Sequence, residues 1–347
     1  MRLVEPGDES GPVAPSRPCP ACGTDARWDA LQIREMMFGS REQFDYGRCR
    51  NCGSLAISRI PDDLSRFYPP DYYANTAREA VPQESWIRRA AVQALVARQF
   101  FGRRSLFAAI ARRAGIRPPR QLSEVRDLIV RGHLSSFDDS ILDVGSGATP
   151  IRLAVLRRLG FQRLLGVDPF VEGDLDFYGV PVRKGHLEDI EGTFQLITFH
   201  HSLEHISDPL GTLLATRERL ADGGRCLVRT PVADGVMWRT YGTDWVELDA
   251  PRHLVVFSRR GLEELARRAG FEVVEMTWES GDWELIASEQ YQRDIAMFEP
   301  SSWFAEPGSA TMDPKTATGY KDAARRMNAQ GDAGRAAFWL RRAAAGN

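Results

Sequence analysis

The sequence contains no apolar run long enough to span a membrane, which argues against an integral membrane protein. The stretch from Met1 to Arg17 is rich in proline, glycine and acid, and it lacks the hydrophobic segment of a signal peptide. We therefore expect a cytoplasmic protein. The sequence shows no internal repeat. It has no large excess of one sign of charge either, because the formal net charge is −2. That balance argues against a surface that binds nucleic-acid phosphates over the whole chain.

Cysteine is scarce, and most of it lies in one pattern. Of the five cysteines, four form two C-x-x-C pairs that are each followed by glycine: Cys19, Cys22, Cys49 and Cys52. Two such knuckles supply the thiolates of a closed, structural Zn²⁺ site with Zn–S distances of ~2.3 Å. The alternatives are two disulfides, which a cytoplasmic location disfavours, and an iron centre of rubredoxin type. The fifth, Cys226, lies in an apolar run and is expected to be a buried packing thiol.

The length of 347 residues is enough for a full α/β domain and a smaller appendage. Composition and hydrophobic pattern divide the chain into five predicted segments. They are a flexible N-terminus (1–17), a zinc-binding module with an aromatic linker (18–75), a basic helical bridge (76–134), a central domain (135–290) and a partly helical C-terminal extension (291–347).

Two segments before the central domain have unusual compositions. The aromatic linker contains the run from Arg66 to Tyr73, which either packs its rings on the central domain or forms a lid with Tyr72 or Tyr73 on the substrate. The bridge has helical spacing from Trp86 to Arg131 and many arginines. One interpretation is that the bridge contacts an anionic partner, either a membrane surface or a polyprenyl-phosphate or nucleotide-linked substrate. The other is that its helices cover an edge of the sheet and its arginines point into solvent.

The central domain begins with a strand that breaks into a glycine turn. Ile141–Val144 is apolar except for Asp143, as a covered parallel strand requires, and Gly145 and Gly147 allow a sharp turn and a close approach of the backbone to a ligand. The next strand, residues 164–167, ends at Asp168. A carboxylate at this distance from the turn suits the ribose hydroxyls of an adenosine ligand. A nicotinamide-type dinucleotide fold fits less well, because Pro150 stands where G-x-G-x-x-G needs its third glycine.

This run resembles the first two motifs of class I S-adenosylmethionine-dependent methyltransferases. The resemblance implies an α/β, Rossmann-like fold, with a mostly parallel seven-stranded sheet and helices on both faces, beside a small zinc-ribbon-like module. It also implies that S-adenosylmethionine is the cofactor. One departure is Thr149, where the family usually has glycine. The cofactor contacts implied for this chain are Asp143, Gly145, Ser146, Gly147, Asp168, Leu187 on the adenine side, and His200.

A second resemblance follows the strand predicted at 194–199, where Leu203-Glu204-His205 and then Asp208-Pro209 match a signature of many small-molecule and sugar methyltransferases. Loops at the carboxyl ends of central strands are where open α/β sheets bind ligands. We expect His205 to act as general base, with Glu204 orienting it. The alternative is that both residues hold the loop while alignment alone drives transfer. His253, in a second family-like segment, is the next candidate base.

The remaining expectations concern later segments. The insertion from Pro231 to His253 is aromatic and charged, so it forms either a substrate wall, in which Arg252 meets a phosphate, or a lid packed on itself. Residues 271–278 and 284–288 are predicted, by resemblance, to be the last two strands of the sheet, paired as an antiparallel hairpin. A helix is expected from about residue 322 to residue 342.

The double knuckle before such a domain resembles bacterial sugar and secondary-metabolite methyltransferases. We therefore expect methyl transfer to a small-molecule or carbohydrate acceptor, most of all a nucleotide-linked sugar or glycan intermediate. An RNA methyltransferase with a zinc ribbon is the first alternative, but the acidic balance and the lack of an Asn-Pro-Pro-Tyr motif after residue 199 argue against it. The second alternative is a non-catalytic scaffold that retains the fold.

Overall fold

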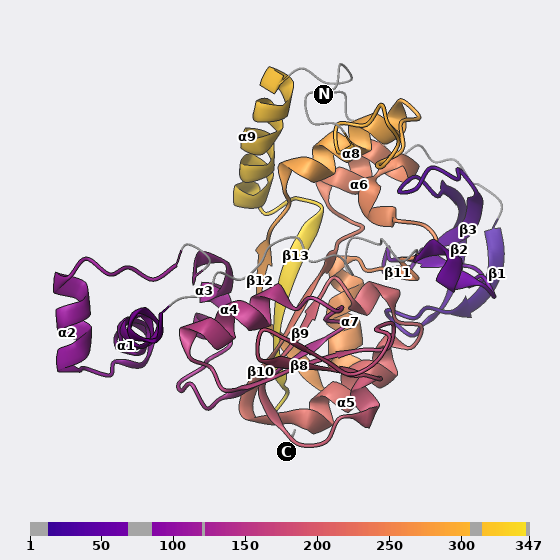
Figure 1. Ribbon diagram of the computed structural model, residues 1–347. Coiled ribbons are helices and arrows are strands. Elements are labelled where there is room, and N and C mark those ends of the chain that lie inside the picture. Colours follow the sequence, from indigo (N-terminus) through magenta and orange to yellow (C-terminus); the bar gives the residue numbers. More distant parts are fainter. Residues whose placement is uncertain (1–12, 69–84, 120–121, 306–313, 345–347) are drawn as a thin grey trace. The chain divides into compact units, whose positions relative to one another are not determined.

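The structure, a computed structural model, describes residues 13–68, 85–119, 122–305 and 314–344 (Figure 1). Tyr72 and Tyr73, proposed above for a lid, lie outside these residues. The chain divides into two compact units, which are described separately. Unit 1 takes the chain up to residue 69 together with 203–213 and 229–338, and unit 2 takes 70–202, 214–228 and the chain from 339 on.

Unit 2 contains the parallel strands that the hydrophobic pattern predicts. β5 pairs with β6 and β9, and β6 pairs with β8, all in parallel, while the short edge strand β7 runs antiparallel to β8. Because parallel strands end at the same edge of a sheet, the segments that follow β5, β6, β8 and β9 gather there. The strands are β5 (Ser140–Val144), β6 (Arg163–Asp168), β7 (Leu175–Phe177), β8 (Val180–Lys184) and β9 (Phe194–His200).

The whole sheet has eight strands in the described residues, in the order β12-β13-β10-β9-β5-β6-β8-β7. The Rossmann-like prediction is confirmed, although one strand more is present than expected. Strands β10 and β13 each contribute residues to both units, and β12 belongs to unit 1. Their bounds are β10 (Leu220–Pro231), β12 (Phe271–Trp278) and β13 (Arg335–Arg342).

Two predictions for the C-terminal part were wrong. Residues 284–288 are not a strand, because they lie in α8 (Asp282–Gln292), where the Glu284 carboxylate accepts from the Gly281 N–H at the helix start. The second wrong prediction is the helix from about residue 322 to residue 342. The structure has α9 (Pro314–Gln330) instead, which ends before Gly331, a glycine in the left-handed region with φ 72°. The following run forms β13, which takes the place beside β12.

The predicted basic bridge is helical. α1 begins where the Ser85 hydroxyl accepts from the Arg88 N–H, and it ends at Gly102, whose φ is 66°. α1 and α3 both contact α4, and Phe101 at the end of α1 packs edge-to-face against Phe137 and Phe161. The four helices are α1 (Trp86–Phe101), α2 (Leu106–Arg113), α3 (Leu122–Val130) and α4 (Ile151–Leu159). A short 3-10 helix, η3 (Leu187–Asp189), follows β8.

Unit 1 contains a second sheet, in the order β1-β2-β3-β4-β11. Its last strand is distant in sequence, since Val255 of β11 pairs antiparallel with Ala56 of β4. Trp28 and Tyr46 are buried in its core, so this module has more apolar core than a bare zinc knuckle. The strands are β1 (Val13–Pro18), β2 (Asp25–Arg34), β3 (Gln43–Cys49), β4 (Leu55–Ile57) and β11 (Val255–Val256).

The insertion after β10 packs on itself, as the second of its two interpretations predicted. Trp245 and Tyr241 are buried, and Arg252 is fully buried, so the expectation of an exposed substrate wall is wrong for these side chains. The remaining elements of unit 1 are η1 (Leu64–Phe67), η4 (Leu203–His205), α6 (Val236–Tyr241), η5 (Gly242–Asp244), η6 (Val246–Leu248) and α7 (Arg259–Arg268), and α5 (Pro209–Arg219) begins in unit 1 and ends in unit 2. None of the described helices combines the length and apolarity needed to cross a bilayer.

Candidate functional site

The glycine loop after β5 is shaped by backbone conformations that suit glycine. Gly145 and Gly147 have φ values of 72° and 64°, in the left-handed region. A Cβ added to Gly145 would lie 2.4 Å from the Cβ of Ser202, so no larger residue fits without movement. The Ser202 hydroxyl donates to the Val144 carbonyl at 2.6 Å and fixes the other side of this turn. The loop thus leaves a narrow backbone cradle at the end of β5.

Asp168 closes this cradle from the end of β6. Its Oδ2 accepts from the Gly147 N–H at 2.9 Å, and its Oδ1 accepts from the Phe170 N–H at 2.8 Å. A carboxylate oxygen can accept more than one hydrogen bond, so both oxygens keep acceptor capacity. Two neighbouring ribose hydroxyls are donors of the kind this carboxylate could bind.

Asp143 is held from the neighbouring strand. Its Oδ1 accepts from the Thr198 hydroxyl at 2.7 Å, and parallel register places Asp143 opposite Thr198 in β9. Both side chains are buried. We did not anticipate Thr198 from the sequence, although it is the one hydroxyl residue within β9. The fixed carboxylate is a suitable partner for a ligand ammonium group.

The adenine side of the predicted site lies around η3. Leu187 is buried, whereas His186 is exposed and donates its backbone N–H to Asp189 Oδ2 at 2.9 Å. His200 lies half-buried at the end of β9, and the Ser146 hydroxyl donates to the Gly147 carbonyl. All seven predicted cofactor residues therefore belong to unit 2, on strands β5, β6 and β9 or in the segments that follow β5 and β8.

The three predicted catalytic residues come together in unit 1. One ligand atom from each of Glu204, His205 and His253 lies within 4.8 Å of the others. The two imidazole rings pack edge-to-face, with centroids 4.6 Å apart. His205 ends η4, and His253 comes from the segment before β11, so tertiary folding joins residues that are far apart in sequence.

Backbone carbonyls fix the tautomers of both histidines. His205 Nδ1 lies 2.9 Å from the Arg252 carbonyl, and His253 Nδ1 lies 2.7 Å from the Glu247 carbonyl. Since a carbonyl can only accept, each Nδ1 carries the hydrogen and each Nε2 keeps its lone pair. Tyr68, whose hydroxyl is 3.1 Å from His205 Nδ1, is a further neighbour from the aromatic linker that sequence reasoning missed.

Burial keeps this cluster uncharged. Desolvation, with a smaller contribution from His253, lowers the pKa of His205 to about 3, and desolvation also lowers the pKa of His253. For Glu204, desolvation raises the pKa to about 8. Two histidines and a carboxylate can bind a divalent transition metal. Neutral imidazoles are the form that binds a metal, and a bound cation would itself lower the pKa of Glu204.

A buried ion-pair network holds the segment that carries His253. Arg252 donates to Asp249 Oδ1 at 2.6 Å and to Glu35 Oε1 at 2.9 Å, and the Arg252 and Glu35 side chains are fully buried. Arg252 is therefore not available to a substrate phosphate, which corrects the expectation from sequence. Glu35 also accepts from the N–H groups of Met37 and Ser40.

The N-terminal sheet contributes directly to this support. The Tyr46 hydroxyl donates to the His253 carbonyl at 2.8 Å, and Arg252 Nη1 donates to the Phe67 carbonyl at 3.3 Å. Neither contact, nor the role of Glu35, has a sequence motif that could have revealed it. The module predicted only to bind metal thus also builds the surroundings of the two histidines.

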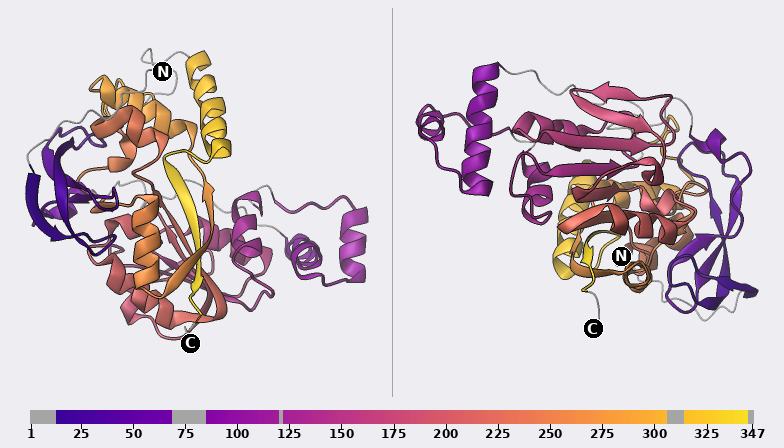
Figure 2. Two further views of the ribbon diagram at one scale, coloured as in Figure 1. Left: turned by 180° about the vertical axis from the view of Figure 1, so that it is seen from behind. Right: turned by 90° about the horizontal axis from the view of Figure 1, so that it is seen from below.

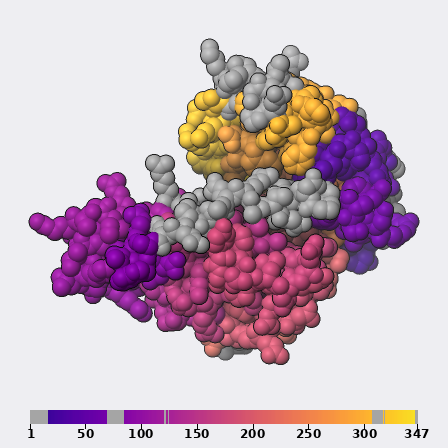
Figure 3. Space-filling view, viewed as in Figure 1, coloured from indigo at the N-terminus to yellow at the C-terminus, as the bar shows by residue number. Residues whose placement is uncertain are grey.

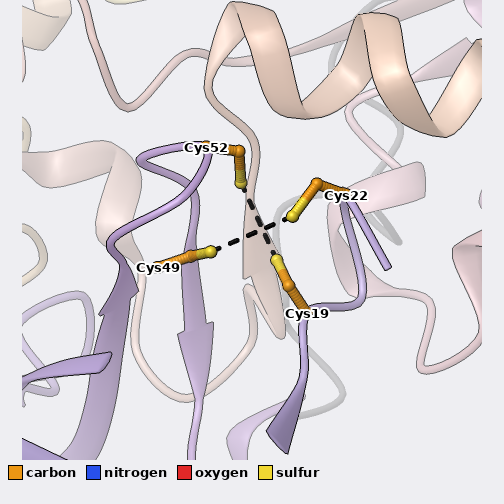
Figure 4. Close-up of side chains that lie close together, drawn as sticks. All are labelled: Cys19, Cys22, Cys49 and Cys52. Atoms are coloured by element: carbon orange, nitrogen blue, oxygen red, sulfur yellow. Dashed lines mark hydrogen bonds between the residues drawn. The ribbon is translucent and has the colours of Figure 1, made fainter. Parts of the chain in front are cut away.

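The four paired cysteines converge at one point of unit 1 (Figure 4). Cys19 Sγ lies 3.8 Å from Cys52 Sγ, and Cys22 Sγ lies 4.0 Å from Cys49 Sγ. Disulfides would need about 2.05 Å, whereas a tetrahedron with metal–sulfur bonds of ~2.3 Å puts its sulfurs roughly 3.8 Å apart. The arrangement therefore fits a tetrahedral metal, and all four cysteines are free.

Local contacts shape the two knuckles. The N–H of Gly23 donates to the Cys19 carbonyl and that of Gly53 to the Cys49 carbonyl, with φ values of 72° and 84° at the two glycines. Ser258, which caps α7, donates its hydroxyl to the Cys52 carbonyl at 2.6 Å. The second knuckle is thereby tied to the segment that follows β11.

A family model described as a methyltransferase domain matches residues 94–276, which is more than half of the chain. The chain belongs to this family. The class I methyltransferase fold expected from sequence is thus confirmed, and S-adenosylmethionine is the methyl donor that this fold implies. No curated protein matches the chain.

Solved structures with similar folds include several methyltransferases. Geranyl diphosphate C-methyltransferase from Streptomyces coelicolor, in complex with Mg²⁺, geranyl diphosphate and S-adenosyl-L-homocysteine, is 14% identical with a TM-score of 0.43, over 78% of this chain and 95% of that one. An S-adenosylmethionine-dependent methyltransferase from Mesorhizobium loti is 14% identical with a TM-score of 0.38, over 64% of this chain and 97% of that chain. A complex of the Haloferax volcanii Trm112 methyltransferase activator with a methyltransferase is 16% identical in sequence with a TM-score of 0.41. The match covers 71% of this chain and 98% of that chain.

The raised pKa of Glu204 predicts a pH-dependent cost to stability. The folded protein holds this proton up to a pKa of about 8, against 4.5 for the free side chain, so it binds more protons than the unfolded chain between these values. Stability therefore falls as pH rises through this window. Glu204→Gln should gain stability relative to wild type from pH 5 to pH 8, by up to about 3 kcal/mol.

Urea unfolding of both proteins at the two pH values measures this difference. The exposed Glu188→Gln should show no such trend and serves as the control. A Glu204→Gln difference that is the same at pH 5 and pH 8 would contradict a protonated, buried Glu204.

Proposed function

We propose that this methyltransferase moves the methyl group of S-adenosylmethionine to a small-molecule or carbohydrate acceptor, such as a nucleotide-linked sugar, a glycan or a secondary-metabolite intermediate. The observation that carries the proposal is the glycine cradle that Asp168 closes through the Gly147 N–H. A cytoplasmic site of action, as the sequence predicts, is part of the proposal.

The donor would be bound entirely by unit 2. Asp168 accepts from the ribose hydroxyls, Asp143 holds the methionine ammonium group, and the backbone of Gly145 and Gly147 lines the chain between them. Ser146, Leu187 and His200 complete the surroundings of the donor. The cofactor supplies an electrophilic methyl on a sulfonium, and the chain's own residues bind and orient it.

We propose His205 and His253, whose side chains lie together in unit 1, as the candidates for contact with the acceptor. An imidazole with a pKa of about 3 stays neutral but is a weak base, so His205 is better suited to accept a hydrogen bond from the acceptor than to remove its proton beforehand. Alignment of the acceptor with the methyl group then drives transfer. His253 is the second acceptor-facing candidate, and Glu204, protonated, would orient the loop.

Two alternatives give different outcomes. An RNA methyltransferase predicts binding to RNA that weakens steeply with salt. A non-catalytic scaffold predicts no binding of S-adenosylmethionine. The neutral pair of a half-buried His205 and a buried His253 does not favour the RNA alternative, because it offers no cation to a phosphate.

The four cysteines, we further propose, hold one structural Zn²⁺. Their sulfur separations suit a closed tetrahedral site, which leaves no coordination position for substrate. Because Ser258 ties the second knuckle to the segment after β11, metal binding would help to order the neighbouring histidine-bearing segment as well.

Replacing Asp168 tests the donor site. Asp168→Asn keeps the side-chain shape but removes its charge and one acceptor oxygen, so affinity for S-adenosylmethionine should fall about 10- to 100-fold. Isothermal titration calorimetry with S-adenosylmethionine and S-adenosylhomocysteine measures this affinity. The control is Asp176→Asn, at an exposed position of β7. Unchanged affinity would overturn the assignment of Asp168.

Replacing His205 tests the acceptor side. His205→Ala should leave donor affinity unchanged and slow methyl transfer roughly 100-fold, whereas His205→Gln, which can still accept a hydrogen bond, should retain more activity. The readout is transfer of labelled methyl from S-adenosylmethionine into the small-molecule fraction of a cell extract, with an extract that received no added enzyme as the blank.

The wild-type rate should not vary between pH 5 and pH 8 through His205, since its pKa lies below this range. Equal rates for wild type and His205→Ala would remove this residue from the acceptor site. Label that enters only nuclease-sensitive material would favour the RNA alternative.

Elemental analysis tests the metal. The wild-type protein should carry about one Zn²⁺ per chain, and Cys49→Ser should lose it and unfold at lower temperature. Cys226→Ala, which changes a buried cysteine of β10, should keep its zinc and is the matched control. A wild-type chain without zinc, with all five thiols reactive after unfolding, would sink the proposal.

A further inference from the structure

The two adjacent helices α1 and α2 lie in a segment whose composition is unlike the rest of the chain. Between Glu84 and Glu124 there are nine arginines and no aspartate or glutamate. Seven of these arginines are exposed in the described residues: Arg88, Arg89, Arg103, Arg104, Arg112, Arg113 and Arg117. Positive charge is thus concentrated here, although the whole chain carries a formal charge of −2.

Helix α2 is turned so that its large apolar side chains face solvent. Its buried residues are the small Ala108 and Ala111, whereas Leu106, Phe107 and Ile110 are 78%, 43% and 54% exposed. Leu106 and Ile110 are four positions apart and therefore lie on one face of the helix. A surface helix of a globular protein normally buries its large apolar residues, whereas no other described part of the chain covers this face.

The start of α1 also exposes large apolar side chains. Trp86 and Ile87 are 78% and 53% exposed, while Val92 and Val96 are buried. The far end of α1 is anchored in unit 2, since Phe101 lies 5.1 Å from Phe137 between ring centroids. Both views of Figure 2 show α1 and α2 beside one another, and Figure 3 shows their atoms on the face in view.

We propose that the α1–α2 helix pair docks on an anionic lipid bilayer. The exposed arginines would neutralise lipid phosphates, while Trp86, Leu106 and Ile110 enter the boundary between headgroups and acyl chains. The helix pair lies on the membrane rather than across it, because α2 has eight residues and neither helix can span a bilayer. This inference does not depend on the identity of the methyl acceptor.

Charge complementarity alone would also suit RNA, but the apolar residues decide between the two. A phosphate backbone offers nothing to Leu106, Ile87 and Ile110, which would stay in water on an RNA complex. A bilayer removes aliphatic surface from water and neutralises arginines at the same depth. Tryptophan is also characteristic of the membrane interface. The combination therefore favours an anionic membrane.

Cosedimentation of the full-length protein with vesicles tests the proposal. Binding to vesicles of phosphatidylglycerol and phosphatidylcholine should be strong at low salt, weaken as salt rises, and be absent for phosphatidylcholine alone. The double variant Leu106→Ser/Ile110→Ser should bind at least ~10-fold more weakly, and so should Arg103→Gln/Arg104→Gln. These exposed positions can be changed without disturbing the core, so affinity for S-adenosylmethionine should not change.

Two matched controls use exposed residues of unit 1. Phe298→Ser removes a 40% exposed apolar side chain, and Arg59→Gln removes an exposed arginine; both should bind vesicles like wild type. No binding to anionic vesicles, or equal binding to phosphatidylcholine, would overturn the proposal. So would salt-sensitive RNA binding unaffected by Leu106→Ser/Ile110→Ser, or a wild-type dimer that this variant turns into monomers.

Discussion

The buried charge of Arg252 is the constraint on which unit 1 depends. A guanidinium taken fully out of water must be compensated, and here Asp249 and Glu35 do so from different parts of the chain. Removing one partner of such a pair typically costs about 3–5 kcal/mol, because an unpaired charge is left buried. The same residue offers its backbone carbonyl to His205 Nδ1, so the ion pairs also set the tautomer of the histidine.

This arrangement gives the cysteine module a second purpose. Glu35, Tyr46 and the Phe67 carbonyl all come from the N-terminal segment and all contact the stretch that carries His253. A metal that orders the cysteine knuckles would therefore also favour the arrangement of the histidines, since Ser258 links the two. The glycine cradle in unit 2 depends on a simpler constraint, the left-handed backbone at Gly145 and Gly147.

Much of the fold could be predicted because its signals are local. The apolar strand that leads into Gly145 and Gly147, the strand that ends at Asp168, and the two C-x-x-C knuckles each appear within a few residues of sequence. The two wrong secondary-structure predictions, for residues 284–288 and for the helix expected up to residue 342, lie where tertiary packing outweighs the local preference of the sequence. The run that forms β13 contains alanines and arginines and suits a helix, yet its place in the sheet buries Phe338 and Leu340.

The sequence alone indicated the family, which the family model confirms, and it supplied the residues that we propose for the methyl donor and for a metal, because all three depend on residue types at short, fixed spacing. The tertiary structure decided that Arg252 is buried rather than free for a phosphate, that Tyr68 lies against His205, and that α2 presents Leu106 and Ile110 to solvent. Burial and tautomer are set by neighbours distant in the chain, and no local pattern specifies them.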